Sequence, residues 1–81
     1  CIINPILEYD RKYKSELWPT LECCFFHSTL ENVSAKLYIH ISTLRYRLQK
    51  IQALTGYNYF DIKGRMSLYM AYLLYKVSQE Q

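Results

Sequence analysis

Residues 32–55, NVSAKLYIHISTLRYRLQKIQALT, constrain the fold more than any other stretch of this sequence. Apolar residues recur there at three- and four-residue steps in two runs, and the residues between the runs break the repeat. This pattern predicts a short helix, a tight turn and a longer helix. No acidic residue occurs between residues 32 and 60, whereas the segment contains Lys36, Arg45, Arg47 and Lys50. We therefore expect this segment to face a polyanion.

The rest of the sequence is typical of a small helical domain. The chain has 81 residues, 51% of them hydrophobic, which is close to the lower limit for a self-sufficient core. No stretch requires a strand, so we expect an all-α bundle of about five helices, Fis-like or winged-helix-like without a substantial sheet. Because the sequence begins with Cys1 rather than Met, we interpret residues 1–81 as one domain cut from a longer protein.

Composition also favours a location. No apolar run reaches the length of a membrane span. The cysteines are Cys1, Cys23 and Cys24, an odd number with spacing that suits neither disulfides nor zinc. We therefore expect a reduced, cytoplasmic setting with no membrane partner.

Capping residues and helix breakers predict where the helices begin and end. Asn4 is expected to cap a first helix with Pro5 at its first position. Pro19 is tolerated only in a first turn, so the second helix should begin within residues 15–18. The later N-caps are expected to be Asn32, then Ser42 or Thr43, and finally Asp61 before a helix over residues 62–78. Gly56 is expected to end the basic helix in a left-handed conformation.

The two central helices meet the geometric requirements of a helix-turn-helix. Ser34 supplies the small residue where the helices cross, and Leu37 and Ile39 anchor the turn on either side. The turn position that favours glycine holds Tyr38, so either this residue is strained or the turn has another shape. The second helix has three residues spaced to face inward, namely Leu44, Leu48 and Ile51.

With those residues buried, the second helix, over residues 42–55, presents its N-terminal face outward. Its side chains would reach base edges in the major groove of double-stranded DNA, and they are His40, Ile41, Ser42, Thr43, Arg45, Tyr46 and Gln49. Arg45 is the candidate for guanine because its two-pronged head matches the two acceptors of that base. Phosphate contacts are expected from Lys36, Lys50, Lys63 and Arg65.

Structural roles compete with DNA contact at several of these positions. Arg47 borders the buried stripe, so its guanidinium can either pair with Asp10 or Glu8 or contact a phosphate. Tyr46 can pack on the first helices, and His40 can bond to the backbone of the turn. His27 is interpreted as a surface residue of the second helix.

Motifs along nearly the whole chain resemble one family. They are Asp10, Glu16-Leu17 with Thr20-Leu21, residues 35–48 (AKLYIHISTLRYRL), Leu54-Thr55-Gly56, and Asp61 with Arg65, Leu68 and Ala71. The most specific piece combines His40 and residues 43–48 with Leu54-Thr55-Gly56. Together they resemble the C-terminal DNA-binding domain of PucR/CdaR-type regulators, the purine catabolism and sugar diacid regulators. The resemblance implies a transcription-factor domain that binds operator DNA through its second motif helix, downstream of a sensory domain in a larger regulator.

The chain departs from that family pattern in three places. Ile41-Ser42 stand where the family usually has Arg-Asn, Ser34 stands where Ala is usual, and residues 12–14 (KYK) lack a common Gly. The absent Arg and Asn are two strong candidates for DNA contact, so the target sequence of the family does not carry over. Thr43, Arg45 and Arg47 are retained, and DNA binding remains the best interpretation.

Other functions have less support in the sequence. The runner-up is a helical dimerisation or interaction module with weak or lost DNA binding, which would use the nine tyrosines for assembly. No pattern predicts an enzyme, a cofactor or a metal site, and His27 near Cys23 and Cys24 is explained by helix packing. RNA binding lacks a signature motif. We expect a homodimer on a two-fold DNA site, held by the wide apolar face of residues 62–77 or by an upstream region.

Overall fold

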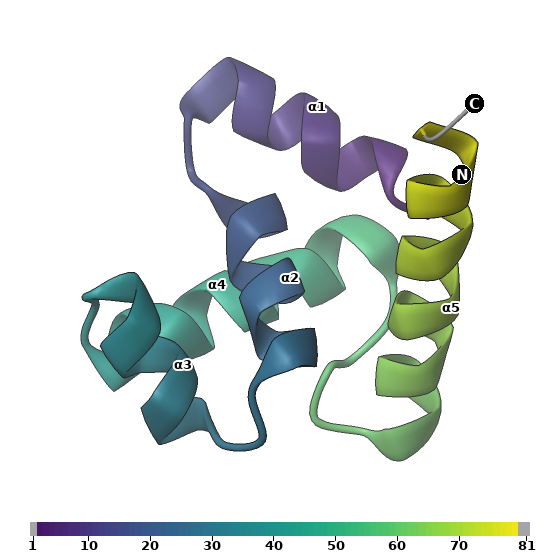
Figure 1. The fold of residues 1–81 in the computed structure, drawn as a ribbon. Helices are drawn as coiled ribbons and strands as arrows, with labels where there is room; N and C mark the ends of the chain where they lie inside the picture. Colours follow the sequence, from purple (N-terminus) through teal and green to yellow (C-terminus); the bar gives the residue numbers. More distant parts are fainter. Residues whose placement is uncertain (1, 80–81) are drawn as a thin grey trace.

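The computed structural model describes residues 2–79, which form five helices and, over that range, no strand. Cys1 lies outside this range. The helices are α1 (Asn4–Tyr13), α2 (Leu17–Phe26), α3 (Leu30–Leu37), α4 (Ile41–Thr55) and α5 (Ile62–Gln79). Helix α2 packs against α1, α3 and α4, and α5 runs along one side of the molecule (Figure 1). The prediction of a small all-α bundle is confirmed.

The core explains why α4 has one fixed face and one open face. Leu44, Leu48 and Ile51 are at most 1% exposed, as their spacing predicts. They belong to one buried cluster with Leu17 and Leu21 of α2. Burying a side chain of this size stabilises the fold by about 1.5–3 kcal/mol. The inner face of α4 is therefore firmly held, and the opposite face stays outside.

Helix α5 is joined to α2 chiefly through aromatic side chains. The rings of Trp18 and Phe25 have centroids 5.4 and 5.3 Å from that of Tyr72. The Tyr72 hydroxyl donates a hydrogen bond to the Glu22 carboxylate at 2.9 Å. These contacts use one side of α5, and large apolar residues on its other side remain exposed.

Helix α2 begins within the predicted range, and a side chain of the neighbouring helix α1 caps its first amides. The Asp10 carboxylate at the end of α1 accepts hydrogen bonds from the Leu17 and Trp18 amides at 2.8 and 2.7 Å. It also accepts one from the Ser15 hydroxyl at 2.7 Å. Asp10 thereby satisfies two amides that a helix start leaves unpaired, and it ties α1 to α2.

Three predicted N-caps are wrong. Asn4 is already helical, because the buried Ile3 has helical dihedrals (φ −77°, ψ −29°) and its carbonyl accepts from Leu7. Pro5 is accordingly one residue further into α1 than predicted.

Asn32 lies inside α3, whose cap is Thr29. The Thr29 hydroxyl accepts a hydrogen bond from the Asn32 amide at 3.1 Å. Ser42 and Thr43 lie inside α4, which His40 caps instead. In α3 and α4, therefore, a polar side chain earlier in the chain than the predicted cap accepts a hydrogen bond from an amide of the first turn.

The boundaries after α3 and α4 both require a left-handed residue. Tyr38 has φ 58° and ψ 40°, so the first alternative for this turn, a strained tyrosine, is the correct one. A left-handed conformation costs a residue with a side chain about 1–2 kcal/mol. Gly56 has φ 83°, and its amide donates to the Gln52 carbonyl at 2.8 Å, which confirms the predicted end of α4.

Candidate nucleic-acid interface

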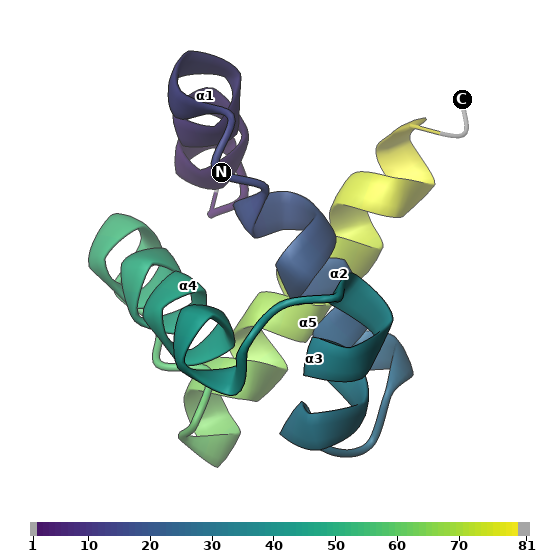
Figure 2. The same cartoon turned by 90° about the vertical axis from the view of Figure 1, so that its left-hand side faces the viewer.

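The outward face of α4 carries the predicted DNA-reading residues together. Figure 2 shows α4 at the left-hand edge of the molecule, with α2 on its inner side and α1 above it. The side chains of Ser42, Thr43, Arg45, Tyr46 and Gln49 are exposed, and Ile41 is partly buried. Tyr46 is 61% exposed, so it does not pack on the first helices. The first two turns of α4 therefore offer a continuous polar and aromatic surface.

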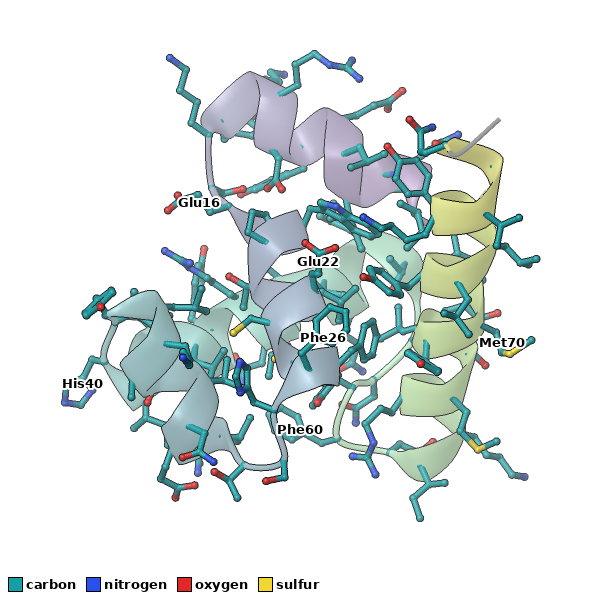
Figure 3. The ribbon with its side chains drawn as sticks, in the orientation of Figure 1. Glu16, Glu22, Phe26, His40, Phe60 and Met70 are labelled. Carbon is teal, nitrogen blue, oxygen red and sulfur yellow. The ribbon has the colours of Figure 1, made fainter. Side chains whose placement is uncertain are left out.

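His40 has a structural role at the start of this surface. Its Nδ1 accepts a hydrogen bond from the Ser42 amide at 3.3 Å and lies 3.1 Å from the Ser42 hydroxyl oxygen. The predicted alternative of a turn residue bonded to backbone is thus realised. The ring is exposed and projects from the tip of the helix-turn-helix (Figure 3). His40 can therefore cap α4 and still present its outer ring edge to a ligand.

Arg47 is held inside the domain. Its guanidinium donates to the Thr20 hydroxyl at 2.9 Å and lies 3.7 Å from the Glu16 carboxylate, and its side chain is 17% exposed. The carboxylate beside Arg47 is that of Glu16 rather than the predicted Asp10 or Glu8; the Asp10 carboxylate instead binds the start of α2. Thr20 is fully buried and donates in turn to the Glu16 carbonyl at 2.7 Å. This chain of contacts favours the structural role over phosphate contact.

Replacing Arg47 with alanine is expected to lower the free energy of unfolding by about 1–3 kcal/mol, because a buried hydroxyl loses its charged partner. Urea denaturation of the purified chain measures this change. Arg45→Ala is the matched control, since Arg45 is exposed and its loss should leave unfolding unchanged. An Arg47→Ala variant that unfolds like the wild type but binds DNA weakly would show instead that Arg47 contacts phosphate.

The predicted phosphate-binding cations differ in how freely their charged ends can reach a phosphate and in where they lie relative to α4. Lys36 near the end of α3 and Lys63 near the start of α5 are exposed. Lys50 is partly buried, with its ammonium 5.0 Å from the centre of the Tyr9 ring. Arg65 lies 5.6 Å from the Tyr59 ring centre and donates to the Tyr59 carbonyl at 3.4 Å. Lys36 shares the helix-turn-helix with His40 and Arg45, whereas Lys63 and Arg65 follow the opposite end of α4.

The cysteines and His27 do not form a nucleophilic pair. Burial raises the pKa of the Cys24 thiol to about 12, and burial also raises the pKa of Cys23. A thiol that stays protonated near neutral pH is a poor nucleophile. His27 is not in the helix as predicted but is the extended residue that follows α2 (φ −132°, ψ 144°). Among residues 2–79, no three potential metal ligands gather at one place, and no helix has the length and apolar character needed to span a bilayer.

The arrangement of α3, the left-handed turn and α4 defines the class of protein. Two helices joined by a three-residue turn, the second with a fixed inner face and an open N-terminal face, form a helix-turn-helix domain. The sequence profile of the PucR C-terminal helix-turn-helix domain matches residues 17–74, and the chain belongs to this family. The resemblance predicted from its motifs is confirmed. A helix-turn-helix domain of this kind is typical of DNA-binding regulators.

Two curated relatives cover most of this chain. An uncharacterized protein of Haemophilus influenzae is 34% identical over 74 residues, which are 90% of this chain and 20% of the relative. The uncharacterized protein YsfB of Bacillus subtilis is 36% identical over 66 residues, 80% of this chain and 17% of the relative. The chain thus spans about a fifth of the length of these relatives. No solved structure matches it significantly.

Proposed function

We propose that residues 1–81 form the sequence-specific DNA-binding domain of a cytoplasmic bacterial transcriptional regulator, with α4 as the recognition helix in the major groove. One observation carries this proposal: the open face of α4 lies within a 29-residue stretch, 32–60, that has no acidic residue. A stretch without carboxylates around an exposed helix N-terminus suits a phosphate-lined groove. The family supports the same role.

Specific roles follow from the geometry of that face. Arg45 is exposed six positions before the inner anchor Ile51 and can donate two hydrogen bonds to guanine. Ser42, Thr43 and Gln49 can bond to bases or phosphates, and Ile41 can contact a thymine methyl group. Lys36 and Lys50 would position the domain by neutralising phosphates. His40 and Tyr46 complete the surface at its N-terminal and outer edges.

Selection of duplexes from a random-sequence library tests the proposal. The purified chain should enrich one motif over several rounds, because base contacts from α4 discriminate among sequences. Failure to enrich any motif would favour the alternative function, an interaction module in which DNA binding is weak or lost. The presence of Ile41 and Ser42 at the tip gives that alternative its physical basis, since neither supplies a cation.

The exposed face of α5 is proposed as the contact of a homodimer. Its apolar residues are spaced by four, three and four positions, as in a helix-pairing seam, and are Met66, Met70, Leu73 and Val77. Each is between 38% and 62% exposed, and Met70 points away from the other helices (Figure 3). A seam of this spacing is self-complementary, so a second copy related by a two-fold axis fits it. The larger protein would add an upstream sensory domain.

Met70→Lys is expected to abolish this dimer, because it places a charge in the middle of the apolar seam. Sedimentation equilibrium across a concentration series measures the association. Tyr13→Lys is the matched control, since Tyr13 on α1 has the same exposed fraction as Met70, 57%. A wild-type chain that stays monomeric throughout the series would show that the α5 face does not pair copies.

A further inference from the structure

Tyr38, in the turn of the helix-turn-helix, has a strained backbone conformation that no packing of its side chain explains. The residue is left-handed, with φ 58°, and its side chain is 94% exposed. Backbone hydrogen bonds close the turn: the Tyr38 amide donates to Ala35 at 3.3 Å, and the Ile39 amide donates to Ser34 at 3.1 Å. A glycine would make the same bonds without strain. The Tyr38 side chain therefore strains the turn without packing against the rest of the domain.

The other tyrosines make this exposure unusual. Within residues 2–79, most of them contact another aromatic ring, and these are Tyr9, Tyr13, Tyr59, Tyr69, Tyr72 and Tyr75. Tyr57 is partly buried against the core. Tyr38 and Tyr46 alone lack both kinds of contact, and both belong to the helix-turn-helix. Tyr46 already lies on the proposed reading face, which leaves Tyr38 to be explained.

We propose that Tyr38 contacts the DNA backbone at the edge of the groove that receives α4. The residue stands two positions before His40, the cap of α4, so it lies beside the helix end that enters the groove. A sugar–phosphate strand forms the wall of the groove at that place. The phenol hydroxyl donates to a phosphate oxygen, and the ring packs on the adjoining sugar. The left-handed turn directs this side chain toward the backbone.

This role rests on the proposed function and has a recognisable signature. A tyrosine is neutral, so its contact releases no counterion when DNA binds. It also touches no base. Loss of Tyr38 should therefore weaken binding to every sequence alike and leave the salt dependence of the affinity unchanged. Loss of a lysine that binds phosphate would instead reduce the salt dependence.

The test compares the wild-type chain with Tyr38→Phe and Tyr38→Gly on a duplex selected from a random library and on a scrambled duplex. Tyr38→Phe should weaken binding to both by about threefold to tenfold, because one hydrogen bond to a charged oxygen is lost. Tyr38→Gly should weaken binding by about tenfold or more, because the packing of the ring on the sugar is lost together with the hydrogen bond. It should also melt about 2–4 °C higher, since relief of the left-handed strain outweighs the added freedom of the unfolded chain.

The outcomes separate this inference from the function on which it rests. A chain that does not bind DNA in its wild-type form overturns both. A wild type that binds DNA, with both Tyr38 variants binding equally well, overturns only the role of Tyr38. Weaker binding by Tyr38→Phe with an unaltered salt dependence supports it even if Tyr38→Gly fails to fold. A lower salt dependence in Tyr38→Phe would also contradict the neutral contact.

Discussion

A Gly64→Ala variant is expected to lose about 3 kcal/mol or more of its free energy of unfolding. Gly64 lies in the first turn of α5 and is buried against the backbone of Asn58, where an added Cβ would come within 2.8 Å of the amide nitrogen and 2.9 Å of the carbonyl carbon. Backbone atoms cannot rotate away as a flexible side chain can. The connector between α4 and α5 would have to move, and the contacts of α5 with the core would be lost with it.

Thermal unfolding measures this effect as a fall in melting temperature of about 12 °C or more for a domain of this size. Gly56→Ala is the informative comparison. Nothing lies within 4 Å of a Cβ at Gly56, so only its left-handed φ of 83° opposes alanine, at a cost of about 1–2 kcal/mol. Equal losses in the two variants would contradict the close approach of Asn58 to α5.

Replacing Arg45 with alanine is expected to weaken specific DNA binding by about 1–3 kcal/mol, or roughly fivefold to 150-fold. The guanidinium of Arg45 is exposed on the open face of α4. Its loss should relax the preference for guanine at one position of the site without changing the melting temperature. Competition binding with duplexes that differ at single positions measures both the affinity and the preference.

Arg11→Ala controls for the loss of one positive charge, because Arg11 is exposed on α1, outside the helix-turn-helix. It should change the base preference at no position. If Arg45→Ala weakens binding to all sequences to the same extent, Arg45 contacts phosphate instead of a base.

The sequence predicts the features of this fold that arise from periodicity. The inward stripe of α4 and the glycine that ends it follow from residue spacing and from the conformation that only glycine adopts cheaply. The same spacing predicts the open face of α4. Residues on a helix are placed by their position in the repeat, whatever surrounds the helix, so this prediction does not depend on the rest of the fold.

Contacts between distant segments could not be predicted in this way. Asp10 of α1 caps α2 across the loop between the two helices. Arg47 donates a hydrogen bond to Thr20, which lies 27 positions earlier in the chain. Each contact depends on how two helices pack, which local patterns do not specify. The N-caps at Thr29 and His40 were missed because other polar residues close by in the sequence offered equally good caps. The near-complete exposure of Tyr38 likewise depends on how α3 and α4 pack, which the local sequence does not specify.

The measurement that tests the central claim most directly is a titration of the chain with duplex DNA at several salt concentrations. Phosphate contacts by Lys36 and Lys50 predict that the logarithm of the association constant falls with the logarithm of salt concentration, with a slope of about −2 per copy. The affinity at about 50 mM salt should be readily measurable. An affinity that does not change with salt, or no binding at that low concentration, would contradict DNA binding by α4.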